Sequence, residues 1–260
     1  MTDHTAPESE GGRASTIVLP GPPHRLVPED GAIHVFWFST DLPPSHVSEL
    51  EPLLSPAERA RADQFRFARD RGRYVAARAR LRTILGRCTN RASGQLEFDT
   101  GPFGKPSLRP GGREERIRFN LSRSDGLGVV AIQLDRELGI DVERMRPFDH
   151  ALAIAERMFT AAEHEALRSL PEAEQLESFF RYWTRKEAVV KSIGLGLAYP
   201  LDAFLLSRDS SATERVAIEC DGVAAVRWVL PVPAPEEGFA AAVATAGTPS
   251  PMRCWSWTDD

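Results

Sequence analysis

Residues 138–143 read LGIDVE, and residues 160–163 read TAAE. The first run is rich in β-forming residues and predicts a strand. The second places threonine at a helix N-cap and glutamate at N3, which is the signature of a capping box. A long helical stretch follows from about residue 173 to residue 193 and should end at Gly194. This order of strand, capping box and long helix decides the fold, because the chain contains it twice.

The earlier copy begins about 105 residues before the later one. Residues 33–38 (IHVFWF) predict a strand, and residues 55–58 (SPAE) combine a serine N-cap, a proline at N1 and a glutamate at N3. A long helical stretch follows to about Gly86. We therefore predict an α+β fold with a pseudo-twofold duplication of two similar halves, each an antiparallel sheet packed by a long helix.

Further strands complete the two predicted sheets. Residues 119–122 and 128–132 predict two strands joined by a turn at Asp125-Gly126. The tail alternates β-like runs with proline and glycine turns, and its predicted strands are residues 216–219, 226–230, 239–243 and 254–257.

Three segments divide the chain. Residues 1–30 are rich in Gly, Pro, Ser and acidic residues without periodicity, which predicts a disordered leader outside the fold. Residues 31–134 form the predicted N-terminal half, and residues 135–260 form the C-terminal half with the acidic residues described below. We expect the active site between the halves.

Composition and charge exclude several classes of protein. The 260 residues are 42 % hydrophobic, enough for a large core, and the net charge of −5 argues against nucleic-acid binding. Cys88, Cys220 and Cys254 lie far apart without CxxC spacing, so we expect reduced, buried thiols rather than disulfides or zinc ligands. No run of about 18 apolar residues is present to span a membrane, and we expect a cytoplasmic protein.

Acidic residues occur in both elements of the later copy. Asp141 and Glu143 are two apart on a strand, so both side chains point to the same face, roughly 7 Å apart. Glu187 and Lys191 are four apart on the helix and share a face, while Lys186 lies about 100° round from Glu187. Three carboxylates without histidine or cysteine nearby favour Mg²⁺, which completes its coordination with water and phosphate oxygens.

Each segment also has a plainer interpretation. Asp141 and Glu143 could cap an exposed strand edge, and Glu187 with Lys191 could form a surface ion pair worth about 0.3 to 0.5 kcal/mol. Gly139, two residues before Asp141, favours a functional site, because glycine permits another backbone to approach closely.

The basic residues are distributed unevenly. Only Lys105, Lys186 and Lys191 are lysines among the 32 basic residues, which leaves 29 arginines. A lysine is a compact point charge and arginine a flat fork, so the retained lysines indicate sites where arginine does not serve; the alternative is an arginine-rich composition that spared three lysines by chance. Ten arginines against two acids between residues 59 and 87 predict an anion-binding patch.

Six motifs resemble those of the Sfp-type 4′-phosphopantetheinyl transferases. They are SPAERARADQFRFARD, GKP, FNLSRS, GIDVE, FTAAEHEAL and YWTRKEAVVKSIGLGL, and they extend over about residues 55–200. The resemblance implies a monomeric enzyme whose two similar halves form a pseudodimer and bind coenzyme A between them. Such an enzyme transfers the phosphopantetheine arm to a serine of an acyl, peptidyl or aryl carrier protein and releases 3′,5′-ADP, as in polyketide and nonribosomal peptide biosynthesis.

The resemblance also implies roles for individual residues. Asp141, Glu143 and Glu187 would hold Mg²⁺ against the pyrophosphate, and Glu187 would also take the proton from the incoming serine. Lys191 would serve as acid, base or charge stabiliser beside the reacting phosphates, and Lys186 would contact a phosphate. Residues from three segments would hold the nucleotide end of coenzyme A, including its 3′-phosphate, namely Arg61, Gly104, Lys105, Pro106, Ser122 and Arg123.

Arg123 departs from the family pattern, which has a histidine at this place in FN[IL]SHS. Arginine keeps its positive charge at every working pH, whereas histidine titrates near neutrality. We therefore expect phosphate binding to persist with less dependence on pH.

Two other classes of function use the same residues. A Mg²⁺-dependent phosphodiesterase or nuclease could employ two acids on a strand with a nearby Glu and Lys, although the acidic total charge counts against it. A non-catalytic binding module could keep the fold without the reaction. Release of 3′,5′-ADP only when a carrier protein is present would distinguish transfer from hydrolysis, and failure to bind Mg²⁺ or coenzyme A in calorimetry would favour the module.

Overall fold

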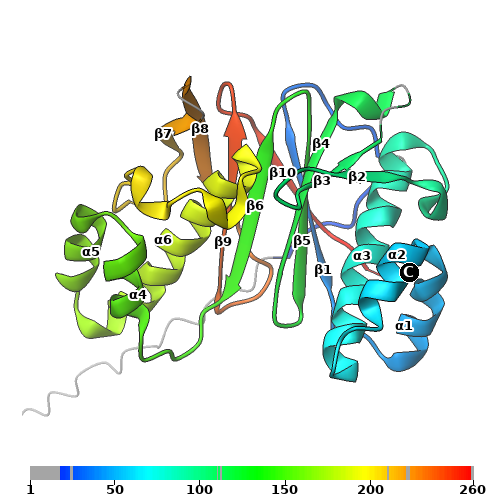
Figure 1. Cartoon of the computed structure of the whole chain (residues 1–260), viewed down its shortest axis with the longest axis horizontal. Coiled ribbons are helices and arrows are strands. Elements are labelled where there is room, and N and C mark those ends of the chain that lie inside the picture. Colours follow the sequence, from blue (N-terminus) through cyan, green and yellow to red (C-terminus); the bar gives the residue numbers. More distant parts are fainter. Residues whose placement is uncertain are drawn as a thin grey trace, which may run out of the picture.

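The computed structural model describes residues 18–23, 26–109, 111, 113–209, 211–220 and 223–258. Two four-stranded sheets lie side by side at the centre of the molecule (Figure 1). Helices of the N-terminal half cover one flank, and helices of the C-terminal half cover the other. The predicted α+β fold of two halves, each a sheet with its own long helix, is confirmed.

The N-terminal half is built on a sheet with the strand order β10-β1-β5-β4. Its strands are β1 (Ile33–Ser39), β4 (Ile117–Ser124), β5 (Leu127–Leu134) and β10 (Met252–Ser256). The helices are α1 (Pro44–Leu50), α2 (Pro56–Ala62) and α3 (Ala68–Thr89), and β2 (Phe98–Thr100) pairs with β3 (Pro106–Leu108) in a small separate sheet.

The C-terminal half is built on an antiparallel sheet with the order β6-β9-β8-β7. Its strands are β6 (Leu138–Arg144), β7 (Glu214–Cys220), β8 (Val223–Pro231) and β9 (Phe239–Ala246), and its helices are α4 (Ala151–Met158), α5 (Ala161–Arg168) and α6 (Glu172–Ile193). Short 3₁₀ turns occur in both halves at Glu51–Leu53, Ser93–Gln95, Arg113–Arg116, Gly196–Ala198 and Leu201–Ala203.

The local helix signals are confirmed. Ser55 and Glu58 form the first capping box, and Thr160 and Glu163 form the second, each with both reciprocal hydrogen bonds. Gly194 ends α6 in the left-handed conformation with φ 76°. The predicted single helix after Ser55 is wrong, because residues 63–67 separate α2 from α3 and let α2 fold back, where Glu58 meets arginines of α3.

Two long-range features differ from the prediction. The tail strand β10 leaves the C-terminal half and pairs parallel with β1, so the first sheet is mixed rather than antiparallel. Part of the leader belongs to the fold, since Leu26 is buried in the core beside α3 and Pro20 accepts a backbone hydrogen bond from Ser256. Residues 1–17 of the predicted leader lie outside the described residues.

The central strands are buried on both faces. In β1, Ile33, Val35 and Trp37 enter a core shared by the two sheets, while Phe36 and Phe38 pack with α3. This follows from the alternation of side chains along a strand, and it explains the nearly continuous apolar run. No helix among the residues that the structure describes has the length and apolar character to cross a membrane.

The same alternation sets the two faces of β6. Leu138, Ile140 and Val142 lie in the shared core. The intervening positions, Gly139 and Asp141, therefore lie on the opposite face, which packs against α6. The acidic residues of the strand are thus directed at the long helix.

Gly139 allows α6 to approach β6 closely. A Cβ at this position would lie 2.3 Å from the carbonyl oxygen of Ala188 and 2.4 Å from the backbone nitrogen of Ser192. Such distances are far below van der Waals contact and involve backbone atoms, so strand or helix would have to move. The glycine predicted to permit close approach does so, and the approaching partner is α6.

We predict that Gly139→Ala lowers the free energy of unfolding by about 1 to 3 kcal/mol, because the added methyl group overpacks the helix contact. Urea unfolding followed by circular dichroism measures this change. Gly94→Ala is the matched control, since a Cβ there meets nothing within 4 Å. A Gly139→Ala protein as stable as Gly94→Ala would contradict the role of the close contact.

Candidate active site at the contact of β4 and β6

The two sheets meet along their edge strands β4 and β6, and we refer to this line of contact as the seam. Side-chain hydrogen bonds cross it at every second residue. Ser122 of β4 donates to Asp141 of β6 at 2.8 Å, and Ser124 donates to Glu143 at 2.7 Å. The N-terminal half therefore holds the two acids that the C-terminal half supplies.

Asp141 is almost completely buried, with 3 % of the residue exposed. Its Oδ1 accepts hydrogen bonds from the Ser122 hydroxyl and from the Lys191 ammonium, the latter at 2.5 Å. Its Oδ2 is buried and has no hydrogen-bond partner in the described part of the chain. Because an unpartnered buried carboxylate oxygen is unfavourable, this atom is a candidate cation ligand.

The other two acids belong to the same electrostatic cluster. Burial raises the pKa of Glu143; the bond from Ser124 opposes the rise, and the charge of Asp141 adds to it. Burial likewise raises the pKa of Glu187, and the charges of Asp141 and Glu143 contribute to the rise while Lys191 opposes it. Glu187 is half-buried, and its carboxylate is in the electrostatic field of Asp141, Glu143 and Lys191.

The donor chemistry of this cluster fits Mg²⁺, because carboxylate oxygens are ligands that this ion prefers and Asp141 Oδ2 is available. The arrangement is not a closed metal site. Across the described ranges, no group of three or more Asp, Glu, His or Cys side chains is arranged to hold a metal ion. The three carboxylates influence one another's charge, Lys191 pairs with Asp141, and their joint binding of a metal ion stays a prediction.

Lys186 lies outside this cluster, which corrects the prediction that it contacts a phosphate. Its side chain is fully buried, with 0 % exposed. The Nζ atom lies 2.8 Å from a carboxylate oxygen of Glu163 and donates to the carbonyl oxygens of Leu201 and Phe204 at 2.8 Å and 2.9 Å. An ammonium has three N–H donors, so none remains for a phosphate.

The GKP loop meets the C-terminal half at the start of β6. Lys105 Nζ donates to Glu137 at 2.7 Å and to the carbonyl oxygen of Leu138 at 3.0 Å. Gly104 turns the loop with φ +88°, and Lys105 and Pro106 line a cavity of about 370 Å³ between the loop and the end of α6. Binding of the nucleotide by this loop stays a prediction.

The Arg61 guanidinium of α2 lies 5.8 Å from the ring centre of Phe65, and that ring centre lies 5.3 Å from the ring centre of Tyr74 in α3. Burial raises the pKa of Tyr74, and the positive charges of Arg78, Arg61 and Arg123 oppose the rise. The positive charges of Arg61 and Arg123 thus act on the same tyrosine, and their binding of the nucleotide stays a prediction.

The arginine-rich patch is smaller than the sequence predicted, because acids pair with many of its members. The ion pairs among the described residues include Arg69–Asp70, Arg71–Glu51, Arg71–Asp63, Arg73–Asp41, Arg73–Asp125, Arg78–Glu58 and Arg82–Glu58. The side chain of Arg82 is also buried, with 2 % exposed. These residues stabilise the N-terminal half and leave only part of the positive charge for a ligand.

The profile of the 4′-phosphopantetheinyl transferase superfamily matches residues 137–244. The chain is 36 % identical over 239 residues to the "4′-phosphopantetheinyl transferase HetI" of Nostoc sp. (strain PCC 7120). The aligned residues make up 92 % of this chain and 98 % of that protein. The chain belongs to this superfamily. It is therefore a transferase, as the resemblance predicted.

Two relatives from bacilli agree with this assignment. The "4′-phosphopantetheinyl transferase psf-1" of Bacillus pumilus is 38 % identical over 172 residues, 65 % of this chain and 71 % of that protein. The "4′-phosphopantetheinyl transferase Sfp" of Bacillus subtilis is 30 % identical over 151 residues, 58 % of this chain and 65 % of that protein.

Two residues that orient the site of the transferase are not among those predicted from its sequence motifs. Ser124 holds Glu143, and Asn120 accepts a hydrogen bond from the backbone nitrogen of Ile140 at 2.9 Å. The sequence pattern indicates these roles, because Asn120, Ser122 and Ser124 occupy every second position of β4 and therefore share one face. Tyr74 carried no comparable local signal.

We predict that Glu187→Gln stabilises the metal-free transferase at neutral pH. Because the pKa of Glu187 is raised in the folded state, the folded protein binds more protons at this residue than the unfolded chain does. The contribution of Glu187 to stability is therefore fully present below the ordinary glutamate pKa and is lost as the pH rises through the raised value. Urea unfolding in EDTA should therefore show a gain for Glu187→Gln at pH 7.5 that shrinks at pH 4. Glu177→Gln, an exposed change on the same helix, is the control. A loss of stability for Glu187→Gln at pH 7.5 would show that burial and the neighbouring carboxylates do not disfavour the charge of Glu187.

Proposed function

We propose that this transferase takes coenzyme A as its donor and moves the 4′-phosphopantetheine arm to a serine of an apo acyl, peptidyl or aryl carrier protein. The reaction depends on Mg²⁺ and releases 3′,5′-ADP. The cluster of Asp141, Glu143, Glu187 and Lys191 carries this proposal, since transfer requires charge stabilisation and a proton acceptor at one place. The names of the relatives support the same activity.

Asp141, Glu143 and Glu187 would hold Mg²⁺. When bound, the ion supplies positive charge that binds pyrophosphate oxygens and stabilises the charge developing during transfer. The unpartnered Oδ2 of Asp141 supports this role. Ser122 and Ser124 would keep two of the ligands oriented across the seam.

The chemical step is a displacement at phosphorus. The serine oxygen of the carrier bonds to the β-phosphorus of coenzyme A, and the bond from that phosphorus to the oxygen bridging the α-phosphate breaks. Glu187 would take the serine proton, because burial raises its pKa and makes it a stronger base. Lys191, whose ammonium is anchored by Asp141 and Ser122, would stabilise the leaving 3′,5′-ADP.

The nucleotide end would bind on the N-terminal half. Arg61 and Arg123 would bind the 3′-phosphate, because guanidinium groups bind phosphate bidentately and the charges of both residues act on Tyr74. Ser122 lies beside Asp141 and would contact the adjoining phosphates. Gly104, Lys105 and Pro106 would hold the rest of the nucleotide from the other end of the seam.

A single chain supplies the whole proposed site. The serines come from β4 and the acids from β6 and α6, which supports the proposal that both halves are needed and that the enzyme works as a monomer. Carrier proteins are usually acidic, and we propose that they dock on a basic or apolar local surface despite the net charge of −5. The use of coenzyme A and carrier proteins would place the enzyme in the cytoplasm.

The direct test is incubation of the protein with coenzyme A, Mg²⁺ and a panel of apo carrier proteins, followed by mass spectrometry. We expect at least one carrier to gain the mass of the arm, and Glu187→Gln to lose this activity while staying folded. Glu177→Gln on the same helix should transfer normally. Full activity of Glu187→Gln would refute its role, and 3′,5′-ADP released without any carrier would indicate a hydrolase.

A second prediction concerns the 3′-phosphate. Arg123→Ala should raise the KM for coenzyme A by about tenfold or more, as expected for loss of a charge-assisted hydrogen bond, and should leave the KM for 3′-dephospho-coenzyme A unchanged. Arg109→Ala is the control, because Arg109 is an exposed residue paired with Glu97 and Asp99. An equal rise in KM for both donors would place Arg123 elsewhere on the nucleotide.

A further inference from the structure

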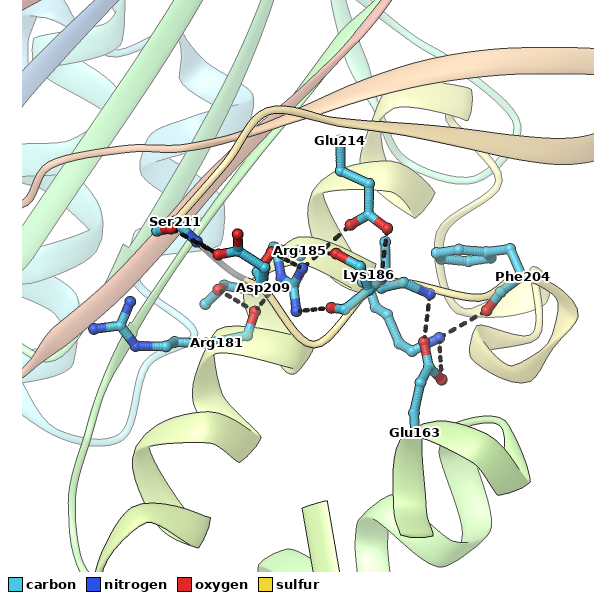
Figure 2. A network of polar contacts seen from close by, with 11 residues as sticks. Glu163, Arg181, Arg185, Lys186, Phe204, Asp209, Ser211 and Glu214 are labelled. Carbon is cyan, nitrogen blue, oxygen red and sulfur yellow. Dashed lines mark hydrogen bonds and ion pairs between the residues drawn. The ribbon is translucent and has the colours of Figure 1, made fainter. Parts of the chain in front are cut away.

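Lys186 is enclosed by a network of polar groups in the C-terminal half (Figure 2). Its ammonium meets three oxygens, one from Glu163 of α5 and two from the carbonyl groups of Leu201 and Phe204. Aromatic rings complete the enclosure, with Nζ 4.4 Å from the ring centre of Phe204 and 5.5 Å from that of Phe159. The lysine therefore joins α6 to α5 and to the segment after Gly196–Ala198.

Glu163 is fixed as firmly as its partner. Its residue is 1 % exposed, and one carboxylate oxygen accepts bonds from the backbone nitrogen and the hydroxyl of Thr160 at 2.8 Å each. The other oxygen accepts a bond from the backbone nitrogen of Leu206 at 2.7 Å. A charge held by this many bonds cannot follow Lys186 if α6 rotates, so the pair resists rotation.

The neighbouring residue strengthens this attachment. Arg185 donates to the carbonyl oxygen of Ser207 at 2.9 Å and forms an ion pair with Glu214 of β7 at 3.2 Å (Figure 2). Two consecutive residues of α6 thus bind groups on different sides of the helix. The next residue along the chain is Glu187.

The geometry also explains why lysine stands here in a chain with 29 arginines. The three oxygens converge on a single nitrogen, which suits the compact ammonium group with its three donors. A planar guanidinium group spreads its donors over a wider fork and would not fit the same enclosure.

We propose that Lys186 is a positioning residue, which, through its buried bond to Glu163, fixes the rotation of α6 and thereby directs Glu187 at Asp141. The inference rests on the proposed function of Glu187. Residues 186 and 187 differ by about 100° around the helix, so fixing one side chain sets the direction of the other. Lys186 itself cannot reach the phosphates, because it is fully buried and its donors are all engaged.

The experiment uses the full chain with Glu163→Gln, Lys186→Met and the double variant. Glu165→Gln with Arg168→Met on α5 is the matched control, since it removes an exposed ion pair from the same helix. Three properties are measured on folded protein: the thermal midpoint, kcat and KM for coenzyme A, and hydrogen exchange of residues 187–192. Glu163→Gln keeps the lysine and two of its acceptors, so it remains measurable if Lys186→Met does not fold.

A positioning role predicts a lower kcat with an unchanged KM for coenzyme A. Displacement of a catalytic group by about 1 Å can cost about 100-fold, so we expect a loss of this order for Lys186→Met and a smaller one for Glu163→Gln. Exchange at residues 187–192 should become faster in both, and the double variant should be no worse than Lys186→Met, because the two residues act as one unit. The control pair should leave all three properties unchanged.

Two results would overturn the proposal. A raised KM for coenzyme A with an unchanged kcat would mean that Lys186 contacts the donor. Unchanged kcat and KM in folded Lys186→Met would mean that the ion pair of Lys186 and Glu163 serves only stability. If the wild-type protein modifies no carrier, the proposed function fails by itself. Hydrogen exchange then decides the present inference, and unchanged exchange at residues 187–192 would refute it.

Discussion

The close approach of α6 to β6 at Gly139 is the constraint on which the site depends. Only glycine leaves room for the helix backbone, which would come within 2.3 Å of a Cβ atom there. This approach allows Lys191 to bond Asp141 at 2.5 Å and brings Glu187 into the field of the same carboxylate. The shared core on the other face of β6 holds the strand in place, so helix and acids have one relative position.

The three lysines share one kind of environment. Lys105, Lys186 and Lys191 each place Nζ among converging oxygens, at the start of β6, inside the C-terminal half and on Asp141. Each of these sites suits a compact ammonium group better than a flat fork. The repeated choice of lysine thus marks attachments of β6 and α6, and only one of the three lies in the acidic cluster.

Sequence patterns that depend on only a few neighbouring residues predict the local structure correctly. The capping boxes at Ser55 and Thr160 and the stop at Gly194 formed as predicted, because each depends on a single turn of helix. The pairing of β10 with β1 depends on strands far apart in the chain, which no local pattern encodes. The position of Lys186 was readable in part, since it follows the core residue Phe179 by seven positions and therefore shares its buried face.

The most direct test of the account is a crystal structure of the protein with coenzyme A and Mn²⁺ in place of Mg²⁺. Anomalous scattering would locate the ion without reference to any assumed ligand. We predict one strong peak at the seam, in contact with Asp141 Oδ2, with Glu143 and Glu187 turned toward it. A peak away from β6, or a Glu187 side chain pointing into bulk solvent on the far side of α6, would contradict the account.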